Sequence, residues 1–87
     1  MAHTPAAELK ERLTAAATQI EIGGRYAHYK HPEQSYRVVT LALLEADESV
    51  AVVYEQEGTD LTFIRPLTSF LETVESENGV VPRFQKL

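Results

Sequence analysis

The stretch Gly23-Gly24-Arg25-Tyr26-Ala27-His28-Tyr29-Lys30 divides the chain into two parts with different hydrophobic patterns. Before it, apolar residues recur every three or four positions, as in an amphipathic helix. After it, short apolar runs are separated by polar turns, which is typical of strands. The stretch itself alternates two sets of side chains, which predicts a strand with different chemistry on its two faces. The sequence therefore predicts an N-terminal helix over residues 1–22 and a β domain over residues 23–87.

The helical pattern is clearest over residues 5–22. Its apolar stripe consists of Leu9, Leu13, Ala16 or Ala17, and Ile20. We expect Thr4 to be the N-cap and Pro5 the first helical residue, where its missing N–H costs nothing. Gly23 or Gly24 is expected to end the helix in the left-handed conformation. The stripe either packs on the β domain or meets a second copy of itself in a homodimer.

The remainder of the chain predicts five to six short strands. The expected strands cover residues 25–30, 36–44, 50–56, 61–65, 73–75 and 80–84. Pro32 predicts a turn over residues 31–35, residues 66–71 predict one helical turn, and Asn78-Gly79 is typical of a hairpin. Short, closely spaced strands favour a mainly β fold, a small SH3-like antiparallel β-barrel with an N-terminal helix. An open α+β sheet with the helix on one face is the alternative.

The strand over residues 36–44 is apolar in both of its alternating sets. One set contains Tyr36, Val38, Ala42 and Leu44, and the other contains Val39, Leu41 and Leu43. A strand of this kind is usually covered on both faces. We expect the barrel interior to cover one face and the N-terminal helix the other.

Length and composition narrow the classes of protein. A chain of 87 residues with 44% hydrophobic and 24% charged residues predicts one folded domain. Without cysteine, disulfides and thiolate metal sites are excluded. The net charge of −5 disfavours binding to nucleic acid, which is itself a polyanion. The sequence has neither a signal-peptide pattern nor an apolar run near the ~20 residues of a membrane span, so we expect a cytoplasmic protein.

No metal or cofactor is expected from the sequence. His3, His28 and His31 do not have the spacing of a known ligand set. The pair Gly23-Gly24 follows a helix, whereas the glycines of a phosphate-binding loop precede one.

Several separated motifs occur in the order of one known family. They are Gly24 to Lys30, Tyr36-x-Val38, Val53-Tyr54, Phe63 to Leu67 with Phe70, and Val81-Pro82-Arg83-Phe84. In these motifs, residues 23–87 resemble the small bacterial proteins of unknown function called DUF1653. The resemblance implies a compact SH3-like β-barrel and no established activity. The chain departs from the family pattern in having His31-Pro32-Glu33-Gln34 in place of a glycine, Phe63 in place of a tryptophan, and Ala42-Leu43-Leu44 in place of an Ala-x-His segment.

Three kinds of side chain are candidates for a site. His28 shares a strand face with Tyr26, and its ordinary pKa suits either a general base or a hydrogen-bond donor. Arg65 and Arg83 each adjoin a proline, and two converging guanidiniums would hold a phosphate or carboxylate. Tyr26 and Tyr54 are candidate stacking walls. The alternatives are a structural histidine, arginines paired with nearby glutamates, and tyrosines that close the barrel ends.

These candidates favour a non-catalytic binding module. We expect a groove formed by Tyr26, His28, Tyr54, Arg65 and Arg83 to hold a small anionic molecule or a peptide carboxylate. One alternative is a small enzyme in which His28 is the general base and Arg65 orients the substrate. The other alternative is an assembly module that dimerises through the stripe of the N-terminal helix.

Overall fold

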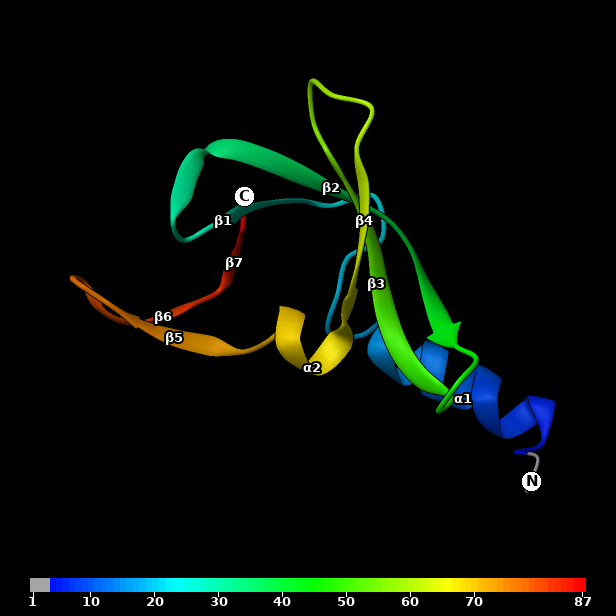
Figure 1. Ribbon diagram of the computed structural model, residues 1–87. Coiled ribbons are helices and arrows are strands. Elements are labelled where there is room, and N and C mark those ends of the chain that lie inside the picture. The colour runs from blue at the N-terminus through cyan, green and yellow to red at the C-terminus, as the bar shows by residue number, and fades with distance from the viewer. Residues whose placement is uncertain (1–3) are drawn as a thin grey trace.

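The computed structural model describes residues 4–87, which form two helices and seven strands (Figure 1). Their bounds are α1 Ala6–Ala16, β1 Arg25–His28, β2 His31–Leu44, β3 Ser49–Gln56, β4 Thr62–Pro66, α2 Leu67–Phe70, β5 Thr73–Ser76, β6 Gly79–Pro82 and β7 Phe84–Lys86. Neither helix of this described part is long and apolar enough to cross a membrane.

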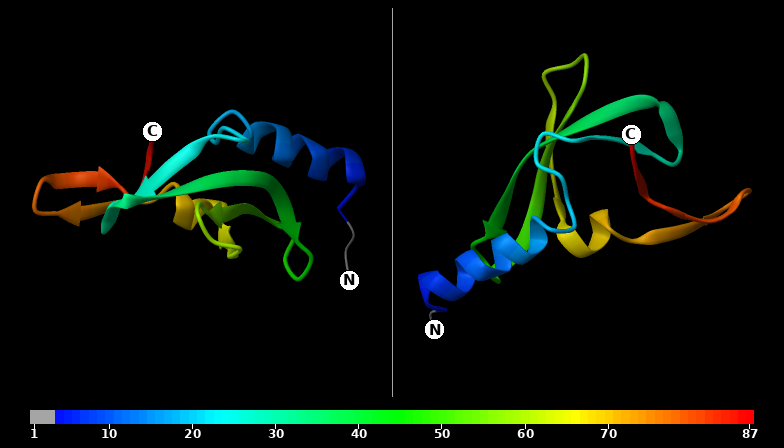
Figure 2. Two further views of the ribbon diagram at one scale, coloured as in Figure 1. Left: turned by 90° about the horizontal axis from the view of Figure 1, so that it is seen from above. Right: turned by 180° about the vertical axis from the view of Figure 1, so that it is seen from behind.

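Five of the strands form one antiparallel sheet in the order β4-β3-β2-β1-β7, and β5 pairs with β6 in a separate hairpin. The short helix α2 follows β4, and the last strand β7 returns to pair with β1. The sheet is strongly curved, and the β5–β6 hairpin projects away from it (Figures 1 and 2). The predicted mainly β, SH3-like fold with an N-terminal helix is confirmed. Its barrel is open between the edge strands β4 and β7, which do not pair within residues 4–87.

The core is a cluster of aromatic rings with a few aliphatic side chains. Its buried members are Ile20, Tyr26, Val38, Val52, Tyr54, Phe70 and Phe84. Phe70 of α2 and Phe84 of β7 stack with their ring centroids 4.1 Å apart and their planes 3° from parallel. Tyr54 of β3 lies edge-on to both rings, at 5.5 Å from each. Aromatic pairs contribute about 0.5–1.5 kcal/mol each beyond the area that they bury, which is a large share of the stability of a small domain.

A β-bulge explains why β2 is apolar on both faces. The pairing register of β2 with β3 shifts between Val38 and Thr40, so Val39 is the extra residue. The bulge reverses the alternation, and Val38 and Leu41 both pack on the aromatic core, whereas Val39 is exposed. Val38 and Leu41, from different alternating sets, therefore both face the core because the phase of the strand changes, and helix α1 also packs on β2, as expected for a strand covered on both faces.

Helix α1 packs on β2 and β3, on the side of these strands opposite α2 (Figure 2). Its stripe contributes Ala16, which is buried, and Leu9 and Leu13, which are half-buried. The sheet within the same chain thus covers much of the stripe.

The helix is shorter than the sequence pattern predicts. It ends at Ala16 rather than at residue 22, and the next residues form tight turns that bring Ile20 into the core. The free energy gained by burying Ile20 exceeds the intrinsic preference of the segment for helix, because helix propensity is a weak preference. At the other end the N-cap is Pro5 without a side-chain cap, and Thr4 Oγ1 instead donates to Glu48 Oε1 at 2.6 Å. Gly23 has a φ of +85° in a later turn and donates its N–H to the carbonyl of Val38.

Two strand boundaries also differ from the prediction. The expected turn over residues 31–35 is the start of β2, and the actual turn is Tyr29-Lys30. Pro32 is tolerated there because the register of β1 and β2 is irregular between Ala27 and His28, where a missing N–H breaks no regular ladder. The expected strand over residues 80–84 is divided at Arg83: β6 pairs with β5, and β7 pairs with β1.

We predict that Phe70→Ala lowers the free energy of unfolding by about 3–5 kcal/mol, because it removes a ring that contacts Phe84, Tyr54 and Tyr26. Urea unfolding followed by circular dichroism measures the change. Val80→Ala is the control, since Val80 is 69% exposed, and should change the free energy by less than about 0.5 kcal/mol. Equal effects of the two variants would contradict the assignment of the core.

Candidate functional site

A groove of about 260 Å³ opens beside the aromatic core, and we call it the aromatic groove. It is lined by His28, His31, Tyr36, Tyr54, Phe63, Arg65 and Phe84. These side chains come from all five strands of the curved sheet, so the groove exists only when the sheet is complete. The structure thus brings together three of the predicted site residues, His28, Tyr54 and Arg65.

Arg65 is half-buried, and its guanidinium contacts three uncharged side chains, Tyr54, Ser69 and Phe84. Nη1 donates to Ser69 Oγ at 3.0 Å, and Nε donates to the hydroxyl of Tyr54 at 3.4 Å. The guanidinium carbon lies 5.4 Å from the centre of the Phe84 ring, a cation–π arrangement. None of the ion pairs within residues 4–87 includes Arg65. Its charge is therefore held in place without being neutralised by a neighbouring carboxylate.

His28 lies on β1 at the other side of the aromatic groove, with its ring edge-on to Phe84 at 5.1 Å. Its Nδ1 accepts a hydrogen bond from the backbone N–H of Lys30 at 3.2 Å, so in the neutral ring the proton is on Nε2. Burial lowers the pKa of His28 from its ordinary 6.5, and the positive charges of Arg65 and Arg83 lower it further. His28 is consequently neutral at pH 7, with Nε2–H as its donor.

The sequence did not assign His31, Phe63 or Phe84 to the site. His31 is exposed beside the groove, and its ring centroid lies 6.3 Å from that of His28. Phe63 is two residues before Arg65 on β4, so strand alternation alone places both on one face. No comparable signal identified Phe84, because its strand was expected to pair with residues 73–75 rather than with β1.

Arg83 does not line the aromatic groove. Its Nη2 donates to Glu72 Oε1 at 2.6 Å, and its backbone N–H donates to the carbonyl of Glu72 at 2.9 Å. Arg83 therefore follows the alternative of an arginine paired with a local acid, although its charge still acts on His28. Its Nε is buried, and no hydrogen-bond partner for it lies among the described residues.

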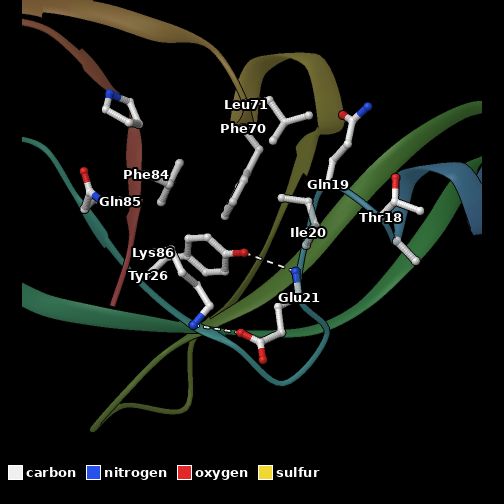
Figure 3. A pocket seen from close by; sticks show the side chains of 12 residues that line it. Thr18, Gln19, Ile20, Glu21, Tyr26, Phe70, Leu71, Phe84, Gln85 and Lys86 are labelled. Carbon is white, nitrogen blue, oxygen red and sulfur yellow. Dashed lines mark hydrogen bonds and ion pairs between the residues drawn. The ribbon is translucent and has the colours of Figure 1, made fainter.

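Tyr26 lines a second pocket, of about 550 Å³, together with Phe70 and Phe84 (Figure 3). Its ring is buried edge-on to Phe70, and its hydroxyl accepts a hydrogen bond from the backbone N–H of Glu21 at 3.1 Å. Lys86 Nζ and Glu21 Oε2 form an ion pair of 2.7 Å beside this ring. Because these two charges neutralise each other, the second pocket offers less attraction to an anion than the aromatic groove does.

The part of the chain described by the structure brings no three histidine, aspartate or glutamate side chains close enough to hold a metal ion. His3, considered with His28 and His31 as a ligand, lies outside the described residues.

The curved sheet, the helical turn after β4 and the return of β7 to β1 define a small SH3-like β protein with a groove lined by all five strands of its sheet. The family described as "Protein of unknown function (DUF1653)" matches residues 24–86, and the chain belongs to this family. The resemblance read from the sequence motifs is thereby confirmed. The crystal structure of a DUF1653 protein from Bordetella bronchiseptica is similar to this chain, with 30% sequence identity and a TM-score of 0.67. The similarity covers 79% of this chain and 90% of the Bordetella chain. No curated protein matches the sequence.

We predict that the pKa of His28, measured by NMR titration of its ring protons, lies below 6.5 and rises in Arg65→Gln. The rise should be incomplete, because burial is the largest cause of the shift. Arg37→Gln is the matched control: Arg37 is exposed on β2 and pairs with Glu55, so its removal should leave the pKa of His28 unchanged. An unshifted His28 in the wild-type protein would contradict the groove geometry.

The same shift predicts how stability depends on pH. The pKa of His28 is lower in the folded protein than in the unfolded chain, so the unfolded chain binds the proton first as pH falls. The contribution of His28 to the free energy of unfolding is therefore complete above about pH 6.5 and is lost between that pH and the lower folded pKa. Urea unfolding at several pH values, compared with His28→Gln, isolates this contribution. Parallel pH profiles for the two proteins would contradict the prediction.

Proposed function

We propose that the protein is a binding module that holds an anionic ligand, a small molecule or a peptide carboxylate, in the aromatic groove. The observation that carries the proposal is the state of Arg65. The other arginines, Arg12, Arg25, Arg37 and Arg83, each pair with a glutamate. In a chain with a net charge of −5, an arginine that is half-buried without an acidic partner marks the place where an anion is attracted.

The surroundings of Arg65 suit this role. Its two hydrogen bonds and the Phe84 ring fix the guanidinium, so that less side-chain entropy is lost when a ligand binds. Within residues 4–87 no hydrogen bond uses its Nη2, whose N–H groups are free for a carboxylate or phosphate oxygen. Nε2–H of His28 is a second donor on the same groove. The aromatic walls displace water, which strengthens both interactions.

A small enzyme with His28 as general base is the second candidate, because His28 and Arg65 line the same groove. A base must present an unprotonated nitrogen to its substrate. The Nδ1 lone pair of His28 is used by the N–H of Lys30, and Nε2 carries the proton. This arrangement supports hydrogen-bond donation to a ligand, and it favours the binding module over the enzyme.

The experiment is an NMR titration of the labelled protein with benzoate and, separately, with inorganic phosphate. We expect chemical-shift changes that cluster at His28, Tyr54 and Arg65 for at least one of these anions. Arg65→Gln should weaken that binding about 10–100-fold, because a charged hydrogen bond contributes about 1.5–3 kcal/mol. Arg65→Lys should have an intermediate effect, since lysine keeps the charge but lacks the planar fork.

Arg37→Gln is again the control, because it removes an arginine that already has a carboxylate partner. Its affinity for the anion should equal that of the wild-type protein. The absence of shifts for both anions, or an equal loss in the Arg37 and Arg65 variants, would refute the proposal.

A further inference from the structure

We infer that the ligand of the aromatic groove is the free C-terminal end of an extended polypeptide, which adds as a strand to the edge of β4 and places its carboxylate at Arg65. This inference rests on the proposed function and specifies its ligand. Three features support it: the unpaired edge of β4, the small size of the groove, and the position of Arg65 and Pro66 at the end of the strand.

The first feature is the hydrogen-bonding edge of β4. In the antiparallel pair of β3 and β4, the N–H of Gln56 donates to the carbonyl of Leu61 at 3.0 Å, which fixes the alternation of the ladder. Phe63 and Arg65 are then bonded to β3, whereas Thr62 and Ile64 direct their N–H and C=O groups away from it. No other strand of residues 4–87 pairs with that edge.

Between Leu61 and Ile64 the edge lacks the features that usually prevent strand addition, and these begin only at Arg65 and Pro66. Charged side chains, prolines and bulges commonly protect an edge strand. The segment from Leu61 to Ile64 has no charged residue and no proline, and both Leu61 and Ile64 are more than half exposed. Short peptides that recognise proteins by strand addition use edges of this kind.

The second feature is the size of the aromatic groove. At about 260 Å³ it is smaller than the ~300–1,000 Å³ of pockets that enclose a drug-sized molecule. It can take one side chain and one anionic group, and the rest of a larger ligand must lie outside. Phe63 and Arg65 connect the groove to the edge directly, since their side chains line the groove while their strand carries the free backbone groups.

The third feature sets the direction of the ligand. Arg65 is near the C-terminal end of β4, so a terminal carboxylate placed there makes the ligand run parallel to β4. Pro66 has no N–H, and strand addition must stop beside it. The backbone pairing therefore ends where the carboxylate would end the ligand. The last side chain, which we expect to be apolar, would face the rings of Phe63 and Tyr54, whose centroids are 5.8 Å apart.

The test compares an acetylated hexapeptide ending in Thr-Val-Leu, with either a free carboxylate or a C-terminal amide, against benzoate as a small anion. NMR titration gives the three affinities and the residues affected. We expect the free peptide to bind at least tenfold more tightly than benzoate and at least tenfold more tightly than its amide, with shifts at Thr62, Ile64 and Arg65.

Ile64→Pro removes an outward N–H from the edge and should reduce peptide affinity at least tenfold without changing benzoate affinity. Ile64→Ala is the matched control, because it shortens the exposed side chain but keeps the N–H, and it should bind the peptide as the wild-type protein does. A peptide methylated at its backbone nitrogens makes the same test without altering the protein, and should also bind at least tenfold more weakly.

The outcomes separate this inference from the proposed function. If benzoate binds at Arg65 but neither peptide binds more tightly, the function holds and the strand-addition inference is refuted. Peptide binding that is insensitive to Ile64→Pro and to backbone methylation also refutes the inference. Concentration-dependent shifts at Thr62 and Ile64 without any peptide would assign the edge to a second copy of the chain, and would likewise refute the inference. If benzoate, inorganic phosphate and peptide all fail to bind, both the proposed function and the inference fail.

Discussion

The stacking of Phe70 on Phe84 joins the last third of the chain to the sheet. Phe70 lies on the helical turn after β4, and Phe84 begins the strand that returns to β1, so their contact holds the two edges of the sheet around one core. Tyr54 and Tyr26 pack edge-on against the stack from the strands between. Phe84 also lines both pockets, and Phe70 lines the larger of the two. The position of the aromatic groove therefore depends on the packing of the core, and the groove cannot be altered at Phe84 without cost to the fold.

The position of Phe84 in the core also explains where the two basic side chains of the groove lie. Phe84 supports the guanidinium of Arg65 on its face and the imidazole of His28 at an edge-on angle. Two basic side chains are thereby kept near each other on an acidic protein, and the charge of Arg65 raises the cost of protonating His28. The lowered pKa of His28 is one result of this arrangement.

The sequence predicted the elements whose cause is local. The switch from a helical to a strand period at Gly23, the hairpin at Asn78-Gly79 and the strand over β3 all follow from side-chain pattern and turn chemistry, although the turn itself is Glu77-Asn78 and Gly79 begins β6. The end of α1 at Ala16 could not be predicted in this way, because it is decided by the burial of Ile20 among residues distant in the sequence. The bulge at Val39 was hidden for a related reason: two apolar sets on one strand are equally consistent with two covered faces and with a change of phase.

The site residues also divide into those that could be predicted from local sequence and those whose roles depend on long-range contacts. His28, Tyr54 and Arg65 could be chosen by residue type, and they line one groove. Arg83 and Tyr26 have the same residue types, but long-range contacts decide their roles: Arg83 is paired with Glu72, and Tyr26 lines the other pocket. Which arginine has an acidic partner is a property of the folded surface, and the spacing of charges along the chain does not reveal it.

The pairing of Arg83 with Glu72 has a consequence for how this protein can vary. A backbone hydrogen bond and an ion pair join these two residues, and the β5–β6 hairpin is the segment between them. The contacts between Arg83 and Glu72 therefore close the hairpin at its base. Its length and sequence can change without moving α2 or β7, since the entropy of closing a loop grows only slowly with loop length. Relatives could accordingly carry hairpins of different lengths on an unchanged sheet, and the projecting hairpin is the natural place to insert a tag or a second domain.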